Sequence, residues 1–184
     1  AFNAPWGDIR YVGVSNDANG NITGTRFVYF GISVEGELST PQPQGFQAVI
    51  YFDYNGDDIL DSCSFNTSPA SGTSRTDVFI NYLAPGCGSG FGQNWLNDYA
   101  ASVADSYVFS NNVYVLPVRL SGAGTTLGRS NATPAFRFQI ELYSEFELMD
   151  VFPNDGSWID YNPNQPIYSF NSTGELDGNA LQMP

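Results

Sequence analysis

Short extended runs, each ended by a turn, dominate this chain and constrain its fold more than any other feature. Residues 135–143 alternate strictly, with large apolar side chains at the even positions and Arg, Gln, Glu and Tyr at the odd positions from 137. This period of two is typical of a strand with one buried face. Residues 46–53 are apolar on both faces, which indicates a central strand. Similar runs recur with Gly, Asn and Pro between them, so the sequence predicts an all-β protein.

The expected architecture is a two-sheet antiparallel β-sandwich, jelly-roll or Ig-like, with eight to ten strands. A chain of 184 residues is long enough for one such core, and no repeat or linker divides it, so residues 1–184 are predicted to form one domain. Only residues 95–109 carry the pattern of a short helix. Pro117 lacks an N–H inside the strand predicted at 112–120, which places that strand at a sheet edge or at a bulge.

The charge balance limits the partners that this chain can have. It contains 19 acidic residues and six basic residues, all arginine, for a net charge of -13. We expect no nucleic-acid partner, because binding to phosphate backbones depends on cationic side chains. The negative charge also disfavours attraction to anionic lipid. The sequence contains no apolar run of 18 residues, so we expect no membrane insertion. The excess of carboxylates favours divalent cations.

The absence of histidine and lysine excludes several catalytic mechanisms. A Ser-His-Asp triad, an HExxH zinc site, a Schiff-base lysine and a phosphate-loop lysine cannot form from this chain alone. A glycosidase carboxylate pair remains open, and the candidates are Glu141, Glu145, Glu147 and Asp150. Glu141 falls on the outward face of its strand, and Glu145 and Glu147 flank a turn. We interpret this cluster as a solvated acidic surface and expect no catalysis.

An acidic loop follows the central strand and is the best candidate ion site. Calcium takes six to eight oxygen ligands from carboxylates, amides and backbone carbonyls, and Gly56 permits the bend that such a loop needs. The loop departs from an EF-hand because Asp58 stands at the sixth place and Ser64 at the twelfth. A polar hairpin turn is the alternative, but we favour a structural calcium ion. The predicted ligands are Asp53, Asn55, Asp57, the carbonyl of Ile59, and Asp61.

Two cysteines indicate an oxidising compartment, and we expect an extracellular or cell-surface location. Cys63 and Cys87 have no neighbouring base or cation that would make them reactive, so we predict a disulfide, which persists in oxidising compartments. Closing the loop between them is worth about 3 kcal/mol in the chain-entropy model. The Asn-x-Ser/Thr triplets permit glycosylation without demonstrating it. They begin at Asn21, Asn66, Asn131 and Asn171.

Seven motifs follow one another over nearly the whole chain. They are YVGVSND at 11–17, FVYFGISVEGELSTP at 27–41, AVIYFDYNGDDILD at 48–61, DVFI at 77–80, YVFSNNVYVLPV at 107–118, FRFQI at 136–140 and SWIDYNPNQP at 157–166. In this order they resemble the β-sandwich domains that follow the catalytic domain in some large secreted subtilisin-like serine proteases. The resemblance implies an extracellular accessory domain without catalytic residues of its own. It places the acidic loop of that group on Asp53, Asn55, Asp57 and Asp61, although Tyr54 and Asp58 replace a small residue and a second glycine there.

The sequence therefore predicts a non-catalytic, calcium-stabilised accessory domain that stabilises its parent protein or contacts a surface or partner. The first alternative is a self-assembling subunit of an extracellular filament, in which residues 1–12 or 167–184 are donated to the sheet of a neighbour. The second is a carbohydrate-binding module, with Trp6, Trp95, Trp158 and the eleven tyrosines as a stacking platform. Aromatic residues in a sandwich more often fill its core or line its strands.

Overall fold

The computed structural model describes residues 7–38, 46–67, 80–88, 92–96, 111–144, 147–164, 168–171 and 173–174. These residues form eleven β-strands and no α-helix. The strands are β1 (Ile9–Asn16), β2 (Arg26–Leu38), β3 (Gln47–Asp53), β4 (Ser62–Thr67), β5 (Ile80–Pro85), β6 (Gly92–Trp95), β7 (Asn111–Ser121), β8 (Phe136–Ser144), β9 (Glu147–Phe152), β10 (Ile159–Tyr161) and β11 (Tyr168–Asn171).

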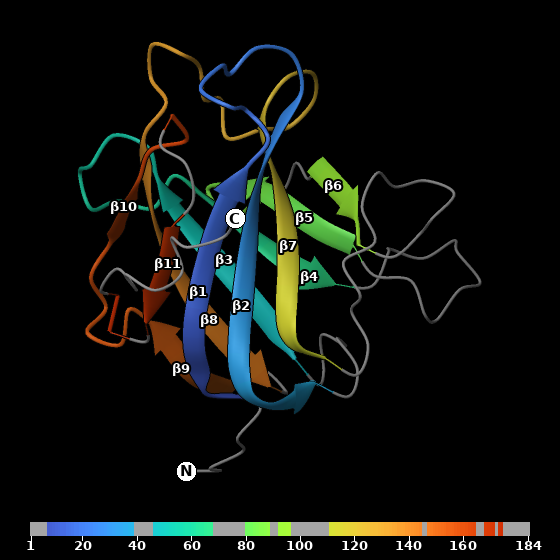
Figure 1. Cartoon of the computed structure of the whole chain (residues 1–184), viewed down its shortest axis with the longest axis vertical. Coiled ribbons are helices and arrows are strands. Elements are labelled where there is room, and N and C mark those ends of the chain that lie inside the picture. The colour runs from blue at the N-terminus through green and yellow to red at the C-terminus, as the bar shows by residue number, and fades with distance from the viewer. Residues whose placement is uncertain are drawn as a thin grey trace.

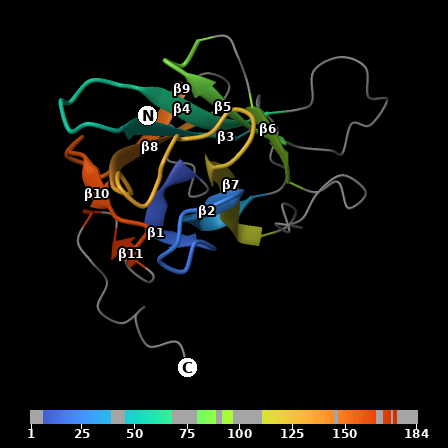
Figure 2. The same ribbon diagram turned by 90° about the horizontal axis from the view of Figure 1, so that it is seen from above.

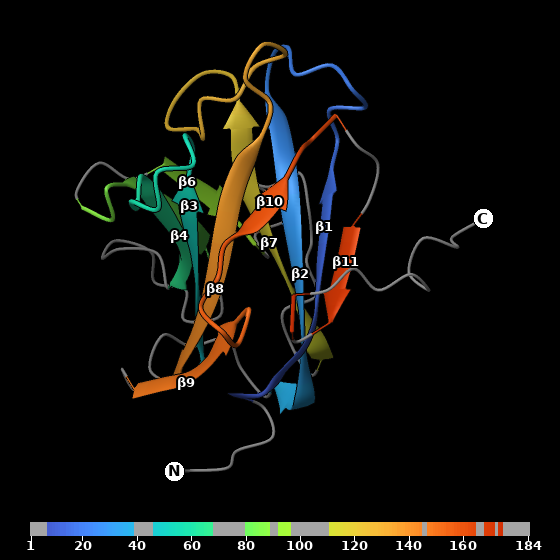
Figure 3. The ribbon, with the colours of Figure 1, turned by 90° about the vertical axis from the view of Figure 1, so that its left-hand side faces the viewer.

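The strands form two antiparallel sheets that pack face to face (Figures 1 and 2). The smaller sheet has the order β11-β1-β2-β7, and the larger has the order β10-β8-β3-β4-β5-β6. The ninth strand also pairs with β8, beyond β10 along that strand (Figure 3). The predicted two-sheet antiparallel sandwich is confirmed. Most of the helix predicted at 95–109 lies outside the described residues.

The core lies between the sheets and is built from the faces that the sequence indicated. Along β8 burial alternates residue by residue, as its pattern predicted. The third strand lies between β4 and β8, which confirms it as central. Phe30 on β2 meets Phe52 and Phe138 edge-on across the interior, with ring centroids 5.8 and 5.1 Å apart. Burying a phenylalanine side chain stabilises a fold by about 1.5–3 kcal/mol, so this cluster joins the two sheets firmly.

Pro117 lies on β7, at the end of the smaller sheet. Within the described part of the chain β7 pairs only with β2, so the strand is an edge strand as predicted. The carbonyl of Pro117 accepts a 2.9 Å bond from the buried amide Nδ2 of Asn81 on β5. This bond links the two sheets at the edge strand β7, the position in which a sheet tolerates proline.

The hairpin predicted at residues 46–66 is confirmed as β3 and β4. Cys63 on β4 forms the predicted disulfide with Cys87, in the turn after β5, and their Cα atoms lie 5.1 Å apart. The disulfide therefore fastens the hairpin to the following strand beside the acidic loop.

Candidate functional site

Asp53 is the centre of the acidic loop that joins β3 to β4. Its side chain is fully buried. Its Oδ1 accepts the N–H groups of Asn55 and Gly56 at 3.0 and 2.7 Å, and its Oδ2 accepts that of Asp58 at 3.0 Å. Gly56 has φ 79° and Asp58 has φ 64°, so Asp58 takes the left-handed conformation that glycine would adopt in a calcium loop. At the sixth place, Asp58 therefore adopts a backbone conformation that favours glycine.

Arg137 brings a positive charge to this loop. It lies on β8 directly opposite Asp53 in the β3–β8 ladder. Its Nη2 donates to the Asp53 carboxylate and lies 2.9 Å from Oδ1 of Asp58. Its guanidinium lies over the ring of Trp158, 5.7 Å from the centroid. Asp53 thus accepts three backbone N–H groups and one guanidinium, which fills the four lone-pair sites of a carboxylate.

These contacts set the electrostatics of the loop. Burial raises the pKa of Asp53, but hydrogen bonds from Arg137 and from the backbone of Gly56, Asn55 and Asp58 lower it more, so the net shift is downward. The same contact with Asp53 is the main cause that raises the pKa of Arg137. Asp53 is therefore held as a carboxylate beside a permanent cation.

The remaining predicted ligands bond to the loop backbone. Oδ1 of Asn55 accepts the N–H of Asp57 at 3.0 Å, and Oδ1 of Asp57 accepts that of Ile59 at 2.9 Å. Oδ2 of Asp61 closes the loop by accepting the N–H of Tyr54 at 2.6 Å. Among the described residues, no group of three or more Asp, Glu, Cys or His side chains is arranged to hold a metal ion. A cation that bound Asp53 would share it with Arg137 or displace that side chain.

Sequence reasoning missed Arg137 because its partner is 84 positions away. No local pattern joins the two residues, and only the register of β3 on β8 brings them together. The sequence does show each residue separately. Arg137 stands on the polar face of an alternating strand, and Asp53 stands at the end of a buried strand.

A second cluster of functional groups covers the outer face of the larger sheet. One row of neighbouring ladder positions crosses four strands, from Glu141 on β8 through Val49 and Phe65 to Tyr82 on β5. Tyr51 lies two positions along β3 from Val49, and Tyr143 lies two positions along β8 from Glu141. We call this set the tyrosine face. It comprises Val49, Tyr51, Phe65, Tyr82, Glu141 and Tyr143.

Glu141 holds two of these tyrosines. Its Oε2 accepts the hydroxyl of Tyr51 at 2.7 Å and also accepts the hydroxyl of Tyr143. Burial is the largest cause that raises the pKa of both phenols, and the hydrogen bonds to Glu141 raise it further. Phe65 and Tyr82 meet edge-on, 5.8 Å between centroids. All five of these side chains are half-buried, so they are fixed in place and still reach the surface.

The other acidic and tryptophan candidates do not gather into one site within the described residues. Glu147 is exposed, and Glu145 lies outside the described residues. Asp150 on β9 accepts the N–H of Ile9 at 2.8 Å, and burial raises its pKa more than this bond lowers it. Of the three tryptophans, Trp158 contacts Arg137, the side chain of Trp95 is not described, and Trp6 lies outside the described residues.

The predicted sequons differ in their access to solvent. Asn21 and Asn131 are exposed and bond to each other, with Nδ2 of Asn131 3.1 Å from Oδ1 of Asn21. Asn66 is fully buried, and its Nδ2 donates to the carbonyl of Phe46 at 3.0 Å. A glycan on Asn66 does not fit this folded domain, because it would attach to that nitrogen. The side chain of Asn171 is not described.

Within the described residues there is no helix long and apolar enough to cross a membrane.

Comparisons with known proteins provide no relative for this chain. Searches against protein-family models, curated proteins and solved structures found no match.

Proposed function

We propose that this chain is a non-catalytic β-sandwich domain of an extracellular protein, which stabilises its parent or binds a surface or partner. The observation that carries the proposal is the tyrosine face. It places four half-buried aromatic side chains and a carboxylate outside the main core, where a sandwich does not need them to hold its sheets together. The disulfide between Cys63 and Cys87 supports an oxidising compartment, and the order of motifs supports an accessory domain.

We further propose a structural calcium ion in the β3–β4 loop. Asn55 and Asp57 each bond to the N–H two residues ahead, which curls the loop and brings alternate oxygens toward one another. Oxygen ligands of this kind suit calcium, and the ion would relieve repulsion among four acids in nine residues. Arg137 competes for Asp53, so calcium binding must overcome that ion pair.

Thermal melting tests the calcium proposal. Calcium should raise the melting temperature of the wild type above its value in EDTA, and Asp57→Ala should abolish the shift. Glu35→Ala is the control, because it removes an exposed carboxylate on β2, in the other sheet from this loop. An EDTA melting curve that matches the calcium curve would overturn the calcium proposal.

Activity and binding assays test the domain function. The purified chain should hydrolyse neither peptide nor glycan substrates, and it should remain folded when expressed alone. Hydrolysis that survives purification to homogeneity would contradict the non-catalytic role.

A self-assembling subunit is the second candidate, and β11 is the observation that favours it. This strand has four residues, lies within the segment 167–184 and pairs only with β1 among the described strands. A short edge strand is suited to exchange between copies. In this structure, however, β11 pairs within its own chain.

A further inference from the structure

The tyrosine face has the dimensions of an extended binding surface. Its central row runs across four neighbouring strands, from Glu141 on β8 to Tyr82 on β5. Neighbouring strands lie about 4.8 Å apart, so the row spans about 14 Å. The residues of this row lie on a sheet rather than on a loop, which fixes their spacing.

The chemistry of this face is both apolar and hydroxyl-binding. A buried floor is formed by Val49, Cys63 and Ala84. The half-buried rings of Tyr51, Phe65 and Tyr143 pack against it. The hydroxyls of Tyr51 and Tyr143 both donate to Oε2 of Glu141, and among the described residues none donates to its Oε1. The face thus offers ring surfaces for apolar C–H groups and a carboxylate oxygen for a hydroxyl donor.

Charge distinguishes between the occupants that this face could take. The chain carries a net charge of -13, and Glu141 adds a carboxylate to the centre of the face, which disfavours nucleic acid and anionic glycans. A symmetric dimer through this face would bring two copies of Glu141 toward each other. A purely apolar partner would desolvate Glu141 without bonding it. A neutral chain of sugars satisfies both the rings and the carboxylate.

The face is also prepared for binding before a ligand arrives. Tyr51 and Tyr143 are anchored by their hydroxyls on one oxygen of Glu141, and Phe65 packs edge-on against Tyr82. Rings that are already fixed lose little conformational entropy when a ligand stacks on them.

We infer that the tyrosine face binds an extended neutral polysaccharide across β8, β3, β4 and β5. The sugar rings stack on Tyr51, Phe65 and Tyr82, and sugar hydroxyls bond to Glu141 and Tyr143. A flat, extended chain matches a sheet surface better than a coiled one. This inference rests on the binding role proposed above and gives it a ligand class.

Native affinity electrophoresis of the whole chain tests the inference. The gels contain one polysaccharide each: hydroxyethylcellulose, xylan or a soluble β-1,4-glucomannan as extended neutral chains, amylose as a coiled one, and alginate as an anionic one. At least one extended neutral glycan should retard the wild type, and titration calorimetry then gives its Kd. Phe65→Ala and Tyr82→Ala should each raise that Kd about tenfold, since each removes one ring.

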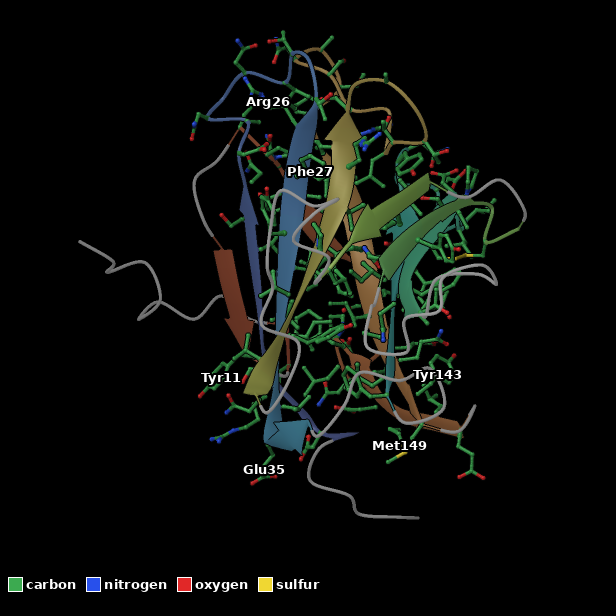
Figure 4. All side chains as sticks on the ribbon, turned by 90° about the vertical axis from the view of Figure 1, so that its right-hand side faces the viewer. Tyr11, Arg26, Phe27, Glu35, Tyr143 and Met149 are labelled. Carbon is green, nitrogen blue, oxygen red and sulfur yellow. A yellow bond between two sulfur atoms is a disulfide. The ribbon has the colours of Figure 1, made fainter. Side chains whose placement is uncertain are left out.

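Matched variants separate binding from folding. Tyr143→Phe keeps the ring and removes only the hydroxyl, so it should weaken binding several-fold while the melting curve shows a folded domain. Tyr11→Ala is the control, because Tyr11 is 43% exposed on the other sheet, on the opposite side of the sandwich from Tyr143 (Figure 4). It should leave the Kd unchanged.

Several results would overturn the inference. They are no retention by any extended neutral glycan, retention only by amylose or alginate, and an equal loss of binding in Tyr11→Ala and Tyr82→Ala. A stable, inactive domain without glycan binding would remove this inference and leave the accessory role standing, whereas hydrolysis of a bound glycan would remove the non-catalytic role and leave the glycan site.

Discussion

The side chain of Asn66 makes two hydrogen bonds to backbone groups of the chain. Its Nδ2 donates to the carbonyl of Phe46, and its Oδ1 accepts the N–H of Ala48 at 2.7 Å. Both bonds are buried, at the place where the β3–β4 ladder begins. An apolar side chain here would leave two backbone groups without partners in the interior, so this amide is needed for the hairpin.

Asn66→Ala should therefore lower the free energy of unfolding by about 3 kcal/mol, since each unsatisfied buried group costs about 1–3 kcal/mol. Asn112→Ala, at an exposed position of β7, should change it by less than about 0.5 kcal/mol. Urea unfolding followed by tryptophan fluorescence measures both. Equal effects of the two variants would mean that water replaces the Asn66 bonds.

The Asp53–Arg137 pair should make stability depend on pH. Because the pKa of Asp53 is lowered in the fold, its contribution is complete above its unfolded pKa of about 3.9 and is lost as pH falls through the lower folded value. Asp53→Asn should be less stable than the wild type at neutral pH, and the difference should shrink as pH falls below about 4. Urea unfolding in EDTA at a series of pH values measures this difference, and a constant gap would contradict the ion pair.

Arg137 can be tested apart from Asp53. Arg137→Gln should destabilise the domain by about 1–3 kcal/mol, because it leaves the buried Asp53 carboxylate without its cation. If calcium binds the loop, the same variant should respond to calcium more strongly than the wild type, since the competing guanidinium is gone. A larger stability loss in EDTA than in calcium would show that competition, and equal losses would contradict it.

At the scale of the element, the sequence predicted best the strands whose own residues carry a clear pattern of apolar side chains. The alternation of β8 and the two apolar faces of β3 are properties of consecutive residues, so both could be read directly. The short strands β9, β10 and β11 have weak patterns of their own and owe their pairing to β8 and β1. The tyrosine face escaped the sequence for the same reason. The sequence placed Glu141 and Tyr143 on an outward face, but only strand register makes them neighbours of Val49, Phe65 and the other members.

The disulfide links two elements, and its removal should be measurable. Cys63→Ala with Cys87→Ala should cost about 3 kcal/mol, because the unfolded chain regains the freedom of a 24-residue loop. Guanidinium unfolding measures the loss, and a reducing agent should destabilise the wild type by a similar amount without affecting the double variant. A double variant as stable as the wild type would mean that the β4–β5 ladder alone holds this region.

At the scale of the whole molecule, the two candidate functions predict different solution states. An accessory domain should elute from size-exclusion chromatography as a monomer at every concentration, because β11 already completes the smaller sheet beside β1 (Figure 3). A subunit that exchanges β11 should form larger species as concentration rises. Removal of residues 167–184 should then abolish those species, and polymers that persist after the deletion would place the contact elsewhere.

The burial of Asn66 also has a consequence for how this protein must be made. Oligosaccharide transfer acts on nascent chains, before the sequon at 66–68 is enclosed by the sheet. A sugar attached there would prevent the amide from reaching Phe46 and Ala48. Secretion through a eukaryotic pathway should therefore give glycosylated, protease-sensitive chains, whereas a bacterial periplasm should supply the disulfide without that damage. Ser68→Ala, which erases the sequon and leaves Asn66 intact, should restore the yield of folded protein from the eukaryotic host.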